Sequence, residues 1–388
     1  MMRENDVIDI LQQEIKIPAV VQKKTNLVFR QIQAERTSKT MKNTKRKWKT
    51  IWLPIAAAVL ALGTTVCAAV YVRWSRGLET QLQVTDEQKH TLEEAQIAAP
   101  VSNSVTEQGI TVTAMQTIVD SRFAYLAFQV EGYHTADGVQ PDFENMTLEI
   151  NGNSHYSMLG GGFFNGLQSD GHGNFTYLDG SPALENADGS VIEKYTDENG
   201  NMEYTMLLMT TDPENSWIGK PLHLELHNLG TVYKAAFTPD IDATWTFDFT
   251  LQGSDKVRTC KLSETLGDSG ATVIEAEISP ISIYAAYDMP MQTQEIDGVN
   301  ENGEKIQSST FVEAPKLSGV RLKDGTLLTQ IANGGSEGYS DSTQIYKASF
   351  ATSSILDPEQ VDALLFIKSY PEGDTPFTEE NLYIVPIE

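Results

Sequence analysis

The sequence predicts a mainly β protein, with two tandem β-sandwich domains that follow one transmembrane helix and a short helical cytoplasmic tail. Three observations carry this prediction. A run of 22 uncharged residues occupies 51–72. From residue 109 onward, apolar and polar residues alternate in short segments, which is typical of half-buried strands. Several of these segments then recur in the same order further along the chain.

Charge divides the chain in the same way. Residues 1–50 hold 12 Lys and Arg against 5 Asp and Glu, whereas residues after 72 hold 16 against 48. The first part suits an anionic surface such as a lipid bilayer, and the acidic part should not bind nucleic acid through bulk charge. With 388 residues and 40% hydrophobic side chains, the chain can form two or three folded units.

The segment 51–72 reads IWLPIAAAVLALGTTVCAAVYV. As a helix it spans roughly 33 Å, close to the hydrocarbon thickness of a bilayer. The basic residues before it are Lys42, Lys45, Arg46, Lys47 and Lys49. Because basic flanks stay inside, these residues place the N-terminus in the cytoplasm and the C-terminal region outside. A cleaved signal peptide is the rival interpretation, but a basic region of about 50 residues is too long for one.

The tail, residues 1–50, contains two short amphipathic patterns separated by Pro18. Their apolar faces comprise Val7, Leu11 and Ile15, then Val21, Val28 and Ile32. Neither helix is long enough to be stable alone in water, so the faces need a partner, which could be each other, the membrane surface or another protein. The alternative is a basic stalk that only fixes topology.

Residues 73–100 read as a membrane-proximal linker with one short helix. Thr85 and Gln88 are spaced as a capping box, and the acidic pair that follows Thr85 favours a helix N-terminus. A helix is therefore expected over 85–95.

The first β domain is predicted over 101–239. Alternation predicts two strands within 109–132, with Ala124, Leu126, Phe128 and Val130 on one face, and further strands at 146–150, 203–210, 221–227 and 231–237. The second domain is predicted over 243–388. Its strands are expected at 245–251, 272–289, 319–328, 342–350 and 363–370.

Four pairs of segments match between the two predicted domains. These are 109–112 with 270–273, 188–190 with 324–326, 203–213 with 345–355, and 222–226 with 363–367. Their order is kept while the spacing differs, so the sequence predicts two copies of one sandwich with loops of different length.

No catalytic motif is present: there is no nucleophile elbow, zinc-protease pair, P-loop or Cys-x-x-Cys. His223 and His227 fall in a predicted strand, where both point to one polar sheet face. The segment 197–201, DENGN, is better explained as a hairpin turn than as part of a calcium loop. Cys260 reads as a buried thiol. The sequence therefore predicts no enzyme, no cofactor and no metal site.

The order of three stretches resembles a known family. KWKTIWLPIAAAVLALGTTVCAAVY is followed by WSRGLETQLQVTDEQKHTLEEAQIA and by GITVTAMQTIVDSRFAYLAFQVEG. Over residues 45–150 this resembles the domain of unknown function 4179 family of Gram-positive membrane proteins, and the second β unit resembles its immunoglobulin-like partner domain. The resemblance implies two immunoglobulin-like domains and an anti-sigma role, in which the tail binds an extracytoplasmic-function sigma factor.

Three hypotheses follow. The first is a membrane-bound regulator whose tail binds a sigma factor and whose outer part senses an envelope signal or an unknown extracellular ligand. The second is an envelope binding or adhesion module, for which the tail is only an anchor; a fold alone does not separate these two. The third is a hydrolase, which the absence of a nucleophile–base pair disfavours.

Overall fold

The computed structural model describes residues 72–169, 174–211, 216–299, 305–339, 344–373 and 375–387. The chain divides into Met1–Ala69 and Val70–Glu388, and every described residue belongs to the second, compact unit. The predicted tail and, apart from Val72, the predicted span lie outside the described residues. In the described part, no helix combines the length and apolar character that crossing a membrane requires.

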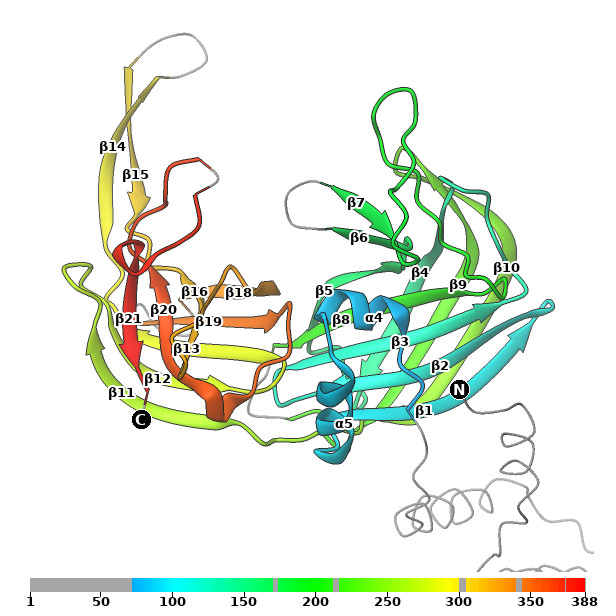
Figure 1. The fold of residues 1–388 in the computed structure, drawn as a ribbon, viewed down its shortest axis with the longest axis horizontal. Helices are drawn as coiled ribbons and strands as arrows, with labels where there is room; N and C mark the ends of the chain where they lie inside the picture. The colour runs from blue at the N-terminus through cyan, green and yellow to red at the C-terminus, as the bar shows by residue number, and fades with distance from the viewer. Residues whose placement is uncertain are drawn as a thin grey trace, which may run out of the picture. The chain divides into compact units, whose positions relative to one another are not determined.

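The described residues are mainly β, and every described strand pair is antiparallel (Figure 1). A first set of sheets begins with the order β1-β2-β3-β8-β5. These strands are β1 (Ala98–Glu107), β2 (Ile110–Val119), β3 (Phe123–Glu131), β8 (Met202–Thr210) and β5 (Tyr156–Phe163). The partner sheet has the order β10-β9-β4, from Ala236–Thr250, Pro221–Tyr233 and Gln140–Ile150. A small hairpin pairs β6 (Leu167–Ser169) with β7 (Phe175–Tyr177).

A second set of sheets follows after the strand-free residues 251–257. Its larger sheet has the order β11-β12-β13-β19-β18, from Arg258–Thr265, Thr272–Ile278, Ser282–Asp288, Ile345–Thr352 and Ala332–Tyr339. Its partner has the order β17-β16-β20-β21, from Leu327–Thr329, Leu317–Leu322, Val361–Ile367 and Leu382–Pro386. A hairpin pairs β14 (Thr293–Val299) with β15 (Lys305–Phe311), and 3-10 turns lie at Pro358–Gln360 and Glu379–Asn381.

Alternation explains how each set packs. In β10, Trp245 and Phe247 are fully buried, whereas Thr246 and Asp248, which alternate with them, are exposed. Trp245 and Phe247 pack against Leu126 and Phe128 of the other sheet in one core cluster. A separate cluster lies between the two sheets of the second set. The chain is therefore a mainly β protein of the sandwich class, in which paired sheets bury their inner faces.

Strand order recurs between the two sets. The order β1-β2-β3-β8-β5 has its counterpart in β11-β12-β13-β19-β18. Three of the four sequence matches take equivalent places: 109–112 and 270–273 lead into β2 and β12, 203–213 and 345–355 contain most of β8 and β19, and 222–226 and 363–367 lie in β9 and β20. The fourth does not, since 188–190 precedes β8 while 324–326 lies between β16 and β17.

The predicted boundary at 239–243 is wrong. β10 runs from Ala236 to Thr250 without interruption and pairs with β9 along its length. The error has a local cause, because the register of β10 shifts on both sides of Ile241 and Pro239 lies beside the first shift. Proline and bulges suit an edge strand but break the alternation that predicts one. The segment 245–251, which was assigned to the second domain, thus belongs almost entirely to β10.

Residues 73–100, predicted to be a linker with one short helix, instead pack on the sheet with two helices. The helix predicted over 85–95 is confirmed as α5 (Asp86–Glu94), and a second helix, α4 (Arg76–Leu82), precedes it. Leu78, Leu82 and Leu92 are at most 1% exposed and pack on the outer face of the sheet that contains β3. Burying each leucine contributes roughly 2 kcal/mol, so both helices are part of the folded unit.

This helical layer explains why β3 is buried on both faces. The face predicted from alternation, which includes Leu126 and Phe128, lies in the first core cluster. The opposite face, with Phe123 and Tyr125, lies under the helices in another cluster that also includes Ile281 of the second set. A two-sided burial pattern is usual for a central strand that is covered by helices.

Candidate functional site

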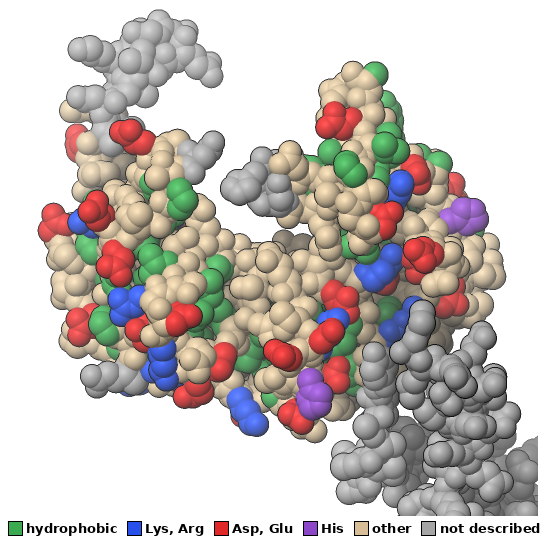
Figure 2. Space-filling view, viewed as in Figure 1, with side chains coloured by type: hydrophobic (Ala, Val, Ile, Leu, Met, Phe, Trp, Pro, Cys, Tyr) green, Lys and Arg blue, Asp and Glu red, His purple; other side chains and the backbone are tan. Residues whose placement is uncertain are grey.

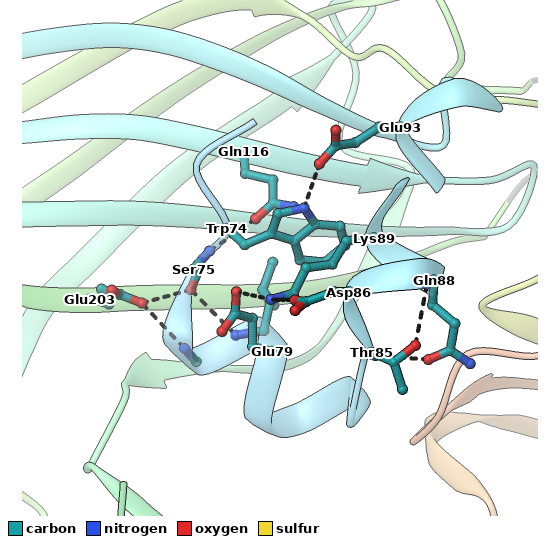
Figure 3. A network of polar contacts seen from close by, with 12 residues as sticks. Trp74, Ser75, Glu79, Thr85, Asp86, Gln88, Lys89, Glu93, Gln116 and Glu203 are labelled. Carbon is teal, nitrogen blue, oxygen red and sulfur yellow. Dashed lines mark hydrogen bonds and ion pairs between the residues drawn. The ribbon is translucent and has the colours of Figure 1, made fainter. Parts of the chain in front are cut away.

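The segment that enters α4 is fixed to the sheet by a buried polar network (Figure 3). Ser75 is the N-cap of α4, with φ −72° and ψ 130°, and its Oγ accepts a hydrogen bond from the backbone N–H of Leu78 at 3.3 Å. Serine is a preferred N-cap because its side chain satisfies one of the free N–H groups in the first helical turn. The cap is fully buried, so Ser75 positions this turn against the sheet.

Glu203 of β8 receives three donors from this turn. Its carboxylate accepts from Ser75 Oγ at 2.8 Å, from Arg76 Nε at 2.9 Å and from the backbone N–H of Gly77 at 3.2 Å. The Glu203 side chain is 6% exposed and that of Arg76 is 29% exposed. We name these four residues the Glu203 clamp. A buried carboxylate requires such compensation, because an unpaired charge inside a protein is strongly unfavourable.

Gln116 of β2 extends the clamp to a second strand. Its Oε1 accepts a hydrogen bond from the backbone N–H of Ser75 at 3.1 Å, and the residue is 1% exposed. Two nitrogens at this site, Gln116 Nε2 and Arg76 Nη2, are buried without a hydrogen-bond partner among the described residues. Each such group costs about 1–3 kcal/mol, so the clamp combines specific bonds with a local energetic cost.

Close approach of α4 to β8 depends on Gly77. A Cβ atom at this position would lie 3.1 Å from Thr205 Cγ2 and 3.2 Å from Phe164 Cβ. Both distances are shorter than ordinary van der Waals contact. The missing side chain therefore lets the first turn of α4 reach the carboxylate of Glu203.

The second helix is held by its own cap and by ion pairs. The capping box predicted between Thr85 and Gln88 is confirmed in both directions. Lys89 bonds Glu79 at 2.7 Å and Asp86 at 3.1 Å. Burial alone lowers the pKa of Lys89, but the hydrogen bonds to Glu79 and Asp86 outweigh burial and the net pKa is raised. Lys89 therefore stays charged and joins α4 to α5.

The indole of Trp74, just before the clamp, is fixed by α5. Its Nε1 donates to Glu93 Oε1 at 2.8 Å. A buried or half-buried indole N–H usually finds such a partner. Together with the clamp, this bond fixes the chain to the β unit at Trp74 and Ser75.

A second buried polar group joins the two sets of sheets. Asp120, which is 1% exposed, accepts hydrogen bonds from the hydroxyls of Ser279 and Ser282. It also accepts from the backbone N–H groups of Arg122 and Phe123 at 2.8 and 2.7 Å. The guanidinium of Arg122 in turn bonds Glu277 of β12. These contacts link the turn before β3 to the beginning of β13.

The polar residues that the sequence analysis considered for metal binding or catalysis have structural partners or are buried. No cluster of three or more His, Cys, Asp and Glu in this part of the chain could hold a metal ion. His223 and His227 lie on one face of β9, as predicted, and contact Glu225 at 3.6 and 3.4 Å. Asp197 closes the predicted turn by accepting from the backbone N–H groups of Asn199 and Asn201, both at 2.8 Å. Cys260 is buried at 4% exposure, as predicted.

The sequence-predicted site residues fall elsewhere. The proposed partner face (Val7, Leu11, Ile15, Val21, Val28, Ile32) and the residues that set topology (Lys42, Lys45, Arg46, Lys47, Lys49) all lie outside the described residues. Sequence reasoning did not find Glu203 or Gln116. The available signal was a charged residue in the apolar strand EYTMLLMT, but the strand pattern gives no indication of its partners.

Comparison with known proteins adds little to these observations. No family model and no curated protein matches the chain. A solved structure described as "the conserved domain protein from Bacillus anthracis" aligns at 14% identity with a TM-score of 0.36, covering 76% of this chain and 87% of that chain. A likeness at this score carries no argument about function.

Proposed function

We propose that the protein is a single-pass membrane regulator. Its cytoplasmic tail binds an extracytoplasmic-function sigma factor, and its acidic outer part senses an envelope signal. The observation that carries this proposal is the Glu203 clamp, because the chain is fastened to the β unit at Ser75, three residues after the predicted span ends at Val72. Three residues reach roughly 10 Å at most, which leaves little slack between the unit and the membrane.

Short coupling of this kind suits signalling better than simple anchoring. A flexible linker would isolate the outer part from the span, whereas a bonded turn passes a change in the sheet to the residues next to the bilayer. A ligand shifts such an equilibrium only through its different affinity for the two states. The clamp joins β8 to the segment next to the predicted span, and Gln116 joins β2 to the same segment. These contacts are a place where two states would differ.

The same proposal includes the architecture. We assign the first set of sheets and the second set to two immunoglobulin-like domains, in line with the resemblance to the domain of unknown function 4179 family. The recurring strand order supports this assignment. The predicted helix at 51–72 would anchor the chain in the cell membrane, with the tail in the cytoplasm and the β unit outside.

The test is a capture experiment on the full chain. The protein, tagged at its C-terminus, is expressed in its host, cross-linked, extracted in mild detergent and analysed by mass spectrometry. One variant replaces the six residues of the proposed partner face with serine. The matched control replaces six polar residues of the same tail with serine: Gln12, Gln13, Gln22, Asn26, Gln31 and Gln33. Resistance to alkaline extraction confirms that each variant remains in the membrane.

We expect a sigma factor with the native chain and with the control, and its loss from the partner-face variant. A sigma factor that binds all three equally would refute the partner face. No sigma factor with the native chain would refute the regulator. The second candidate, an envelope binding module with an inert tail, would then be favoured, and the recurring sandwich supports it as a binding scaffold.

A further inference from the structure

A cleft of about 410 Å³ lies where the two sets of sheets meet. Its floor is the outer face of the β11-β12-β13-β19-β18 sheet. Ser336 and Tyr284 both lie beside Ser349 in neighbouring strands, and Gly338 and Ala286 lie beside Lys347 in the next row. Most of the side chains on this floor are small, and the space above them forms the cleft. Binding sites of small molecules commonly have this volume and this position between folded units.

Arg122 forms one wall, but its charge is already used. Its guanidinium donates to Glu277 at 2.9 and 2.8 Å and stacks on the Tyr284 ring at 3.7 Å. This arrangement holds the side chain in place and neutralises it. Arg122 thus shapes the cleft, but its charge is paired with Glu277 and is not free to hold an anion.

Lys347 is the cation that remains. It is half-buried on β19 and forms no ion pair with any described residue, although the chain outside the predicted membrane segment is strongly acidic. The other charged group in the cleft, Glu337, lies 3.9 Å from Lys316, and burial raises its pKa. An ammonium group with three donors in such a position is suited to an anion.

Hydroxyl groups supply most of the remaining polar surface. Ser157 lies on the opposite wall, and Ser349 lies on the floor beside Lys347. Neither hydroxyl bonds to another described residue. Because a hydroxyl both donates and accepts, such a surface matches the hydroxyls of a sugar or polyol.

We propose that this cleft binds an anionic polyol, with Lys347 holding its carboxylate or phosphate and the serine hydroxyls holding its hydroxyl groups. The inference that this ligand is the sensed signal rests on the proposed function. Binding itself does not depend on a sigma factor.

The experiment measures binding to the full chain in nanodiscs of zwitterionic lipid by calorimetry at low salt. Glucuronate and glycerol phosphate are the two probes, which separate a carboxylate source from a phosphate source. Glucose, glycerol, acetate and inorganic phosphate are the reference compounds. The variants are Lys347→Gln and, as a control with the same loss of charge outside the cleft, Lys323→Gln.

We expect one of the anionic polyols to bind at least tenfold more tightly than its neutral and its simple-anion counterparts. Lys347→Gln should weaken this binding at least tenfold, whereas Lys323→Gln should leave it unchanged. The proposal is overturned if neither probe binds, if the simple anions bind equally well, or if both variants behave alike. If a sigma factor is captured but neither probe binds, the ligand proposal for the cleft is refuted and the regulator proposal still stands.

Discussion

Replacing Glu203 with glutamine should loosen the segment that enters α4 without unfolding the β unit. The amide keeps the shape of the carboxylate but loses its charge, and its NH2 group would face donors from Ser75, Arg76 or Gly77. Those three donors now share one carboxylate at 2.8–3.2 Å. The change is therefore confined to the clamp.

The expected magnitude is about 3 kcal/mol. Breaking a buried ion pair costs roughly 3–5 kcal/mol, and hydrogen bonds to charged groups contribute about 1.5–3 kcal/mol each. The low end applies, because the Arg76 side chain is 29% exposed and water compensates part of its loss. At about 1.4 kcal/mol for a factor of ten, the local opening equilibrium should shift roughly 100-fold.

Hydrogen exchange followed by mass spectrometry measures this shift on the full chain in nanodiscs. Peptides that cover residues 75–83 should exchange roughly 100-fold faster in Glu203→Gln, while peptides from β12 and β13 keep their native rates. The matched control is Glu149→Gln, an exposed position on β4. If residues 75–83 exchange at the same rate in both variants, or if all peptides accelerate equally, the clamp is not what holds this segment.

Three further outcomes test the rest of the structure. Gly319→Ala would place a Cβ atom 1.9 Å from the carbonyl oxygen of a neighbouring strand, so it should destabilise the protein by about 2–4 kcal/mol in thermal melts, while Gly162→Ala, which meets nothing within 4 Å, should change little. The hydrogen bond to Asp248 raises the pKa of His223 above 6.5. This pair therefore stabilises the fold fully below the unfolded pKa of His223 and loses its effect as pH rises through the folded pKa. An NMR titration should show a lower pKa for His223 in Asp248→Asn, and an unchanged pKa would contradict the assignment. In a chain whose other cysteine is replaced by serine (Cys67→Ser), Cys260, at 4% exposure, should react with a membrane-impermeant maleimide only after denaturation, and rapid labelling of this native variant would be inconsistent with its burial.

Local chemistry was predictable where a few neighbouring residues decide the outcome. The capping box at Thr85 needs only Gln88 three positions later, and the structure contains it. The alternation of Leu126 and Phe128 fixes which face of β3 meets the first core. Both signals are short-range, so the sequence carries them completely.

Prediction failed where distant residues decide. The seven residues of α4 are too few to form a stable helix alone, and they are helical because Leu78 and Leu82 pack on a sheet. β10 was divided at Pro239 because the sequence does not indicate that this strand lies at a sheet edge, where a proline and bulges are tolerated. Each error is one of tertiary context.

By itself, then, the sequence determined the mainly β character, the capped helix after Thr85 and the acidic charge of the residues after 72. The tertiary structure alone decided that Glu203 bonds Ser75, a partner 128 positions away. It also decided that the two helices pack on the outer face of the sheet instead of forming a linker. The physical reason is that a strand pattern specifies which side chains share a face but not what covers it. Burial on that outer face, and the compensation that a buried carboxylate requires, exist only once the distant segments pack together.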